Sequence, residues 1–139
     1  MPLRSVLGAS VRRPDVTFRK SDGRISVTAG VASRLGIKGG DSIDIIADDY
    51  ECHLAVRPHS PAGRYKAVCR PTNRGKHRCR NFRAYSREIC DYVCARFGSE
   101  VVQLSAGDIT EHPLHGRLVT LINRNMYGHQ SSISVDNAV

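Results

Sequence analysis

One stretch of the chain decides the fold: residues 16–46, VTFRKSDGRISVTAGVASRLGIKGGDSIDII. Residues 16–20 alternate apolar and polar side chains, which predicts a β-strand with one apolar face. Residues 21–23 are Ser-Asp-Gly, and an Asp-Gly pair between alternating runs favours a hairpin because glycine adopts positive φ without a steric cost. Residues 24–27 are then the predicted return strand.

The second half of this stretch predicts a short helix, a turn and a third strand. Val31 and Leu35 are four residues apart, which places them on one face of a helix, and Gly36 is a typical helix stop. Residues 38–41, Lys-Gly-Gly-Asp, form a predicted turn. Alternation resumes at residues 43–45, which predicts a strand.

The order of these elements resembles the AbrB-like (SpoVT/AbrB) swapped-hairpin DNA-binding family. The matching segments are GRISV at residues 23–27 and VASRLGIKGGD at residues 31–41, followed by a closing hairpin from Ile43 to Arg57. The resemblance implies a mainly β fold with short helices, in which a homodimer forms a swapped-hairpin β-barrel. It also implies a sequence-preferring double-stranded DNA-binding protein, either a transcriptional regulator or an antitoxin-type repressor.

The chain of 139 residues divides into four expected parts. Residues 1–14 form a basic N-terminal arm, and residues 15–58 form the AbrB-like domain. Residues 59–122 are a basic linker and a C-terminal α+β extension, and residues 123–139 are expected to be a flexible tail. A unit as short as residues 15–58 buries little core alone, so a second copy is expected to complete it.

Within the C-terminal extension the clearest feature is a helix at residues 85–97, capped by Ser86 and stopped by Gly98. Strands are expected at residues 65–68, 101–104 and 118–122, a loop at 70–80 and a turn at 106–108. The helix and following strand repeat the spacing of Val31, Leu35 and Ile43. Helix-turn-strand is common, however, so a duplication is the less favoured interpretation.

Charge is distributed unevenly along the chain. The formal net charge is +8, and the tract from Cys52 to Arg87 has ten basic residues and no acidic one. Such a tract attracts a phosphate backbone, although a solvated loop has the same composition. An alternative function is a dimerisation or adaptor module whose basic tract binds RNA or an acidic protein partner.

The predicted DNA contacts come from three basic clusters and from Arg34 on the first predicted helix. Basic side chains on a two-stranded ribbon can contact phosphates or guanine edges in a groove, although the exposed face of a sheet is also where charged residues ordinarily lie. The candidates on the arm, the hairpin, the first helix and the tract are Arg12, Arg13, Arg19, Lys20, Arg24, Arg34, Arg74, Lys76, Arg78 and Arg80.

The spacing of cysteine and histidine residues permits a metal site but does not favour one. Cys90 and Cys94 are four apart on the predicted helix, with Cys69, His77 and Cys79 upstream. Mixed thiolate and imidazole sets bind zinc, yet these gaps match no common zinc module, and a cysteine on an apolar helix face usually packs as a small hydrophobe. We expect no metal and no cofactor.

No enzyme class is indicated, because the chain has no nucleophile elbow, phosphate-binding loop or H-E-x-x-H motif. His112 and His115 fall in a Pro-containing loop, where a surface turn is the simpler interpretation. No apolar run is long enough to cross a bilayer, and the N-terminus lacks a secretory apolar region. Five cysteines without a disulfide framework favour reduced thiols, so a cytoplasmic location without membrane contact is expected.

Overall fold

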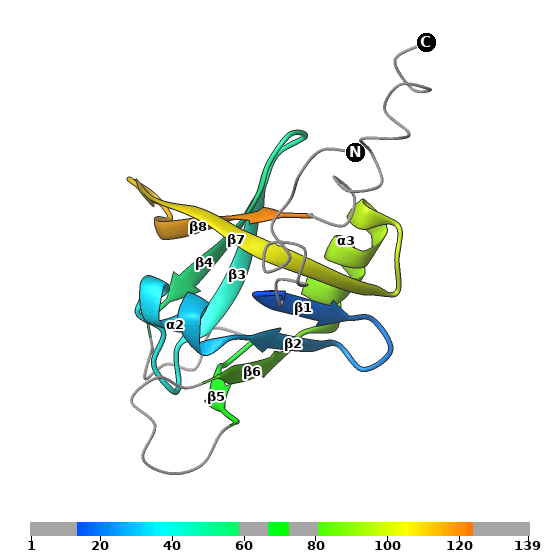
Figure 1. The fold of residues 1–139 in the computed structure, drawn as a ribbon, viewed down its shortest axis with the longest axis horizontal. Helices are drawn as coiled ribbons and strands as arrows, with labels where there is room; N and C mark the ends of the chain where they lie inside the picture. Colours follow the sequence, from blue (N-terminus) through cyan, green and yellow to red (C-terminus); the bar gives the residue numbers. More distant parts are fainter. Residues whose placement is uncertain (1–13, 59–66, 73–80, 124–139) are drawn as a thin grey trace, which may run out of the picture.

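Eight strands and two short helices make up the computed structural model, which describes residues 14–58, 67–72 and 81–123 (Figure 1). This confirms the prediction of a mainly β fold with short helices. The predicted N-terminal arm up to Arg13 and the tail from residue 124 lie outside these ranges. The elements are β1 Val16–Arg19, β2 Arg24–Val27, α2 Ala29–Leu35, β3 Ser42–Ala47, β4 Cys52–Arg57, β5 Arg70–Pro71, β6 Phe82–Tyr85, α3 Arg87–Phe97, β7 Val101–His112 and β8 Gly116–Ile122.

The elements predicted over residues 16–46 are confirmed. Strands β1 and β2 pair antiparallel with Arg19 opposite Arg24, and Gly23 in the connecting turn has φ +70°. Helix α2 ends at Gly36, whose left-handed conformation (φ 74°, ψ 32°) lets its backbone N–H bond to carbonyls of the last turn. Strands β3 and β4 form the closing hairpin.

Three predictions in the C-terminal half were wrong in detail. Tyr85 ends strand β6 rather than starting the helix, which begins at Arg87 because the Ser86 hydroxyl accepts a hydrogen bond from the Ile89 N–H at 3.1 Å. The turn predicted at residues 106–108 is a β-bulge inside β7, since β8 pairs with β7 on both sides of it. The segment predicted as a loop from residue 70 begins with the short strand β5.

The predicted strand at residues 65–68 falls partly outside the described ranges. Its last residue, Val68, forms an isolated antiparallel bridge with Ser42. Two backbone hydrogen bonds flank the bridge, from Cys69 N–H to the Asp41 carbonyl (2.7 Å) and from Ile43 N–H to the Ala67 carbonyl (3.2 Å). This bridge matters because it joins the two ends of the sheet.

The strands form one antiparallel sheet in the order β3-β4-β8-β7-β1-β2-β6-β5. The sheet curls so that β5 approaches β3, where the Ser42–Val68 bridge lies (Figure 1). Strand β7 makes the curl possible: its first half pairs with β1 and its second half with β8, and the bulge bends it between them. Both expected segments, residues 15–58 and 59–122, therefore contribute strands to the same sheet.

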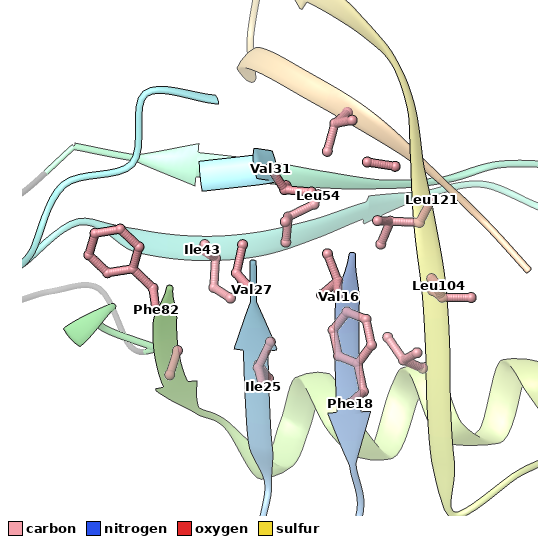
Figure 2. Close-up of a cluster of buried hydrophobic side chains, with 14 of the residues drawn as sticks. Val16, Phe18, Ile25, Val27, Val31, Ile43, Leu54, Phe82, Leu104 and Leu121 are labelled. Atoms are coloured by element: carbon pink, nitrogen blue, oxygen red, sulfur yellow. The ribbon is translucent and has the colours of Figure 1, made fainter. Parts of the chain in front are cut away.

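One hydrophobic core fills the inside of the curl. Phe18, Ile25 and Leu104 are fully buried, and Figure 2 shows their side chains meeting those of Ile43 and Leu54 from the opposite strands. Helix α2 follows directly after one end of β2, and α3 follows Tyr85, which pairs with the other end of β2. The helices thus lie at opposite ends of the central strands and leave the outer face of those strands free of helices (Figure 1).

Candidate nucleic-acid interface

The outer face of the central strands is set by the two-residue alternation of a β-strand. Phe18 in β1, Ile25 in β2 and Ala84 in β6 point into the core and are buried. Because successive side chains point to opposite faces, their neighbours in sequence point outward. The outward positions of these central strands are occupied mainly by polar and basic residues.

Four of these outward residues are arginines, which we call the arginine array: Arg19, Arg24, Arg83 and Arg70. Arg19 lies directly opposite Arg24 on β1 and β2, and Arg83 lies directly opposite Arg70 on β6 and β5. Arg24 pairs with Tyr85 across β2 and β6, so Arg24 and Arg83 are diagonal neighbours. The array crosses four adjacent strands, β1, β2, β6 and β5.

The array is unfavourable for stability. Like charges directly opposite each other on neighbouring strands are destabilising, and here two such pairs lie side by side. The other outward residues that lie opposite one another across these strands and β7 are uncharged: Thr17, Ser26, Tyr85, Val101 and Gln103. A concentration of positive charge without paired carboxylates on the strands themselves is the electrostatic pattern of an anion-binding surface.

Within the described part of the chain, only Arg19 of the array has an acidic partner. Its Nε and Nη2 atoms donate to the two carboxylate oxygens of Asp22 at 3.1 and 2.5 Å. These hydrogen bonds to Arg19, together with the Arg24 backbone N–H, lower the pKa of Asp22 to about 2. Asp22 is therefore ionised at neutral pH, and the Arg19 charge is offset within the hairpin.

Arg83 has the least satisfied environment in the array. Its Nε atom is buried and has no hydrogen-bond partner among the residues that the structure describes. Arg24 and Arg70 form no ion pair with an acidic residue in the part of the chain that the structure describes. A buried guanidinium nitrogen without an acceptor costs free energy.

An exposed aromatic side chain lies beside the array. Tyr85 is opposite Arg24 on β6 and is 54% exposed. An aromatic ring on a basic surface can stack on a nucleobase, and stacking is tolerant of base sequence. The surface thus combines positive charge with one exposed aromatic ring.

The predicted site residues are only partly brought together. Arg19 and Arg24 belong to the array, and Lys20 is exposed in the adjoining turn. Arg34 lies apart from them, because its Nη2 donates to the Gly107 carbonyl at 2.5 Å in the β7 bulge. The remaining candidates lie outside the described ranges: Arg12, Arg13, Arg74, Lys76, Arg78 and Arg80.

Sequence reasoning missed Arg70 and Arg83 as site residues. The signal was the alternation in Phe82-Arg83-Ala84-Tyr85, which is typical of a half-buried strand. That alternation predicts a strand with Arg83 on its outward face, but it does not identify the neighbouring strand. Only the pairing of β6 with β2 places Arg83 next to Arg24.

Three of the cysteines considered as metal ligands, Cys69, Cys90 and Cys94, are buried in the core. The Cys90 thiol donates to the Arg24 carbonyl and the Cys94 thiol to the Glu100 carbonyl, each at 3.6 Å. Burial raises the pKa of Cys90 to about 11 and of Cys69 to about 12, so both thiols are protonated at neutral pH. No group of three ligating side chains occurs among the residues described, and His77 and Cys79 lie outside them.

A separate cleft of about 810 Å³ lies between β3 and the N-terminal half of α3. Asp44 and Glu88 both line it, and the Asp44 carboxylate lies 3.5 Å from the Arg57 guanidinium. Its two carboxylates and one arginine give no excess of positive charge. The arginine array is therefore the stronger candidate for binding a nucleic acid.

Comparisons of the chain with models of protein families, with curated proteins and with solved structures found no match. No helix within the described ranges is long and apolar enough to cross a membrane.

Proposed function

We propose that the protein binds double-stranded DNA through the outer face that carries the arginine array. The single observation that carries this proposal is the placement of Arg24, Arg83 and Arg70 on adjacent strands without acidic partners among the described residues. Such a surface costs stability in the free protein. The cost is offset when phosphates pair with the guanidinium groups and release their counterions.

Phosphate contacts would position the protein, and base contacts would give it sequence preference. An arginine on a β-ribbon can donate two hydrogen bonds to guanine O6 and N7 in the major groove. The basic residues at 74–80 lie in sequence between β5 and β6, two of the strands that carry the array. They would add attraction to phosphates that is independent of the DNA sequence. Together these terms describe a DNA-binding protein with modest sequence preference.

The regulatory role follows from the AbrB-like resemblance, which suggests a transcriptional regulator or an antitoxin-type repressor. The swapped-hairpin homodimer that the resemblance implies stays a prediction. In this chain both edges of the β1–β2 hairpin are already paired, with β7 on one side and β6 on the other.

A second candidate function is binding of single-stranded nucleic acid, such as RNA, by an adaptor module. One observation favours it: the exposed Tyr85 ring lies beside Arg24, as in surfaces that combine basic residues with stacking aromatics. A single ring is weaker support than four arginines. Duplex DNA is therefore the first candidate.

Fluorescence anisotropy with labelled duplex DNA, single-stranded DNA and RNA of equal length, each at stated salt concentrations, tests the proposal. We expect the duplex to bind most tightly, with an affinity that falls as salt rises. Tighter binding of single strands that is lost in Tyr85→Leu would favour the second candidate. Absence of binding to all three nucleic acids would overturn both.

A further inference from the structure

We infer that a single chain presents a twofold-symmetric DNA-reading surface, so that one molecule recognises a duplex site with local dyad symmetry. This inference rests on the proposed function and adds the kind of duplex and the stoichiometry. It starts from the order of elements, which is strand-strand-helix-strand-strand in both halves of the chain: β1-β2-α2-β3-β4 and β5-β6-α3-β7-β8.

The pairing of strands follows the same symmetry. Exchanging the two halves turns the β1–β2 hairpin into β5–β6 and the β3–β4 hairpin into β7–β8. The contacts between halves exchange in the same way. In the pairs β2–β6 and β4–β8 the two strands simply trade places. The β1–β7 pair becomes a contact between β5 and β3, and the Ser42–Val68 bridge lies at that contact.

Local features of the two helices agree with this exchange. Each helix follows the preceding strand after one residue, Thr28 before α2 and Ser86 before α3. Each ends at a glycine in the left-handed conformation, Gly36 at φ 74° and Gly98 at φ 68°. The second half of the chain thus repeats the order of elements of the first half, with a longer helix of 11 residues against 7.

The arginine array obeys the same symmetry. A twofold axis perpendicular to the sheet at the Ile25–Ala84 pair exchanges Arg24 with Arg83, because each lies one residue from the axis on its own strand. The same exchange relates the Arg19–Arg24 pair of the first hairpin to the Arg70–Arg83 pair of the second. Four arginines from two unrelated stretches of sequence are therefore arranged as two equivalent pairs.

The dimensions of this arrangement fit a duplex. Neighbouring strands are about 4.8 Å apart, so the four strands of the array span roughly 14 Å. The major groove of B-DNA is about 12 Å wide and admits a two-stranded ribbon. The inner pair, Arg24 and Arg83 on β2 and β6, would enter the groove and reach base edges, and the outer pair, Arg19 and Arg70, would contact phosphates at its two edges.

The test is selection of preferred duplexes from a randomised library by the full chain, followed by measurement of the complex mass by native mass spectrometry. We expect a selected site with dyad symmetry, occupied by one chain per duplex. We also expect Arg24→Ala and Arg83→Ala to reduce discrimination about tenfold or more at symmetry-related base pairs, since a bidentate pair discriminates by about 1–3 kcal/mol. Arg19→Ala and Arg70→Ala should weaken binding to all duplexes alike.

Each other outcome has a distinct meaning. Selection of an asymmetric site, or binding of two chains to one duplex site, would overturn the internal symmetry while leaving duplex binding intact. Equal losses on all sequences in Arg24→Ala and Arg83→Ala would also overturn it, because the inner arginines would then contact only phosphates. Failure of wild-type protein to bind any duplex would overturn the proposed function as well.

Discussion

At the scale of single residues, Arg83 connects stability with function most clearly. Its Nε atom is buried and finds no hydrogen-bond partner within the described ranges, and Arg70 lies directly opposite on β5. Replacing Arg83 with methionine removes the charge and keeps an unbranched stem. We expect Arg83→Met to leave the free energy of unfolding unchanged or to raise it by up to about 1 kcal/mol, because repulsion between opposite like charges is relieved.

Urea denaturation of wild type, Arg83→Met and Arg117→Met checks this prediction. Arg117 is the matched control, because it is an arginine on another strand whose Nε bonds to Glu111 at 2.9 Å. We expect the control to bind DNA as wild type does, and Arg83→Met to bind more weakly. A loss of stability of 2 kcal/mol or more in Arg83→Met, on the scale of about 1–3 kcal/mol for a lost buried partner, would show that Arg83 is a structural residue.

Asp22 is expected to restrain the array rather than to support it. Its carboxylate holds the Arg19 guanidinium at 2.5 and 3.1 Å, so Arg19 must exchange this partner to contact a phosphate. We predict that Asp22→Asn binds duplex DNA more tightly at low salt, with a salt slope steeper by about one unit for one added phosphate contact. Asp49→Asn is the control, since Asp49 is exposed in the β3–β4 turn and changes the net charge equally. Equal gains in both variants would mean that only net charge matters.

The pKa of Asp22 sets the pH range of this effect. Because the pKa is lowered to about 2, the carboxylate is charged at neutral and mildly acidic pH, and its contribution to stability is lost as pH falls from the ordinary value of 3.8 through about 2. The affinity difference between Asp22→Asn and wild type should therefore not change between neutral and mildly acidic buffers. Anisotropy titrations at two such pH values check this, and a difference that disappears in the mildly acidic buffer would contradict it.

At this scale the sequence predicted half of the array. Arg19 and Arg24 lie on a hairpin whose Asp-Gly turn fixes their pairing locally, so a short stretch of sequence was sufficient. Arg83 and Arg70 lie far along the chain from Arg24, and only the non-local pairing of β2 with β6 brings them together. No local propensity encodes that pairing.

At the scale of elements, the β1–β2 turn is held by Gly23. Its φ is +70°, and a Cβ at this position would approach the Arg87 backbone nitrogen at 3.0 Å. Gly98 has φ +68° with no atom within 4 Å of the added carbon. Gly98→Ala should therefore cost about 1–2 kcal/mol from the left-handed conformation alone, and Gly23→Ala should cost more because it also displaces the start of α3.

Thermal and urea denaturation of the two alanine variants check this comparison. The Gly23→Ala variant should also bind duplex DNA more weakly, because the turn positions Arg19 and Arg24 at the ends of its strands. Equal costs in the two variants would show that the turn does not depend on its contact with α3.

Helix α2 tests the packing predicted from the spacing of apolar residues. Leu35 is 3% exposed at the end of this helix and belongs to the core cluster. Leu35→Ala should lower the free energy of unfolding by about 2–5 kcal/mol, as for other truncated buried leucines. Ser33→Ala is the control, because Ser33 is exposed on the same helix. An unchanged denaturation midpoint in Leu35→Ala would contradict the assigned packing.

Elements that are specified locally were predicted well, and elements that depend on a distant partner were not. The hairpin, α2 and most of α3 follow from turn residues, caps and spacing of apolar residues. The continuous strand β7 did not, because Ala106-Gly107-Asp108 reads as a turn unless β8 pairs on both sides of it. The start of α3 was misplaced for the same reason, since β2 recruits Tyr85 into β6.

At the scale of the whole molecule, the curled sheet explains how a short hairpin domain gains a core. Strands β1 and β2 are covered at both edges by β7 and β6, and both halves contribute to one hydrophobic cluster. The burial argument predicted that a second copy completes residues 15–58. In the structure, strands β6 and β7 of the same chain pair with the two edges of the hairpin. The weak repeat of helix and strand spacing was the sequence signal of this intramolecular arrangement.

The central claim is that the arginine array on the outer face, rather than net charge, binds duplex DNA. The most direct measurement is the salt dependence of duplex affinity for wild type, Arg24→Gln/Arg83→Gln and the charge-matched control Arg96→Gln/Arg117→Gln. We predict that the array variant loses most of its affinity and that its salt slope falls by about two units, while the control resembles wild type. Equal affinities and slopes in the two double variants would contradict the claim.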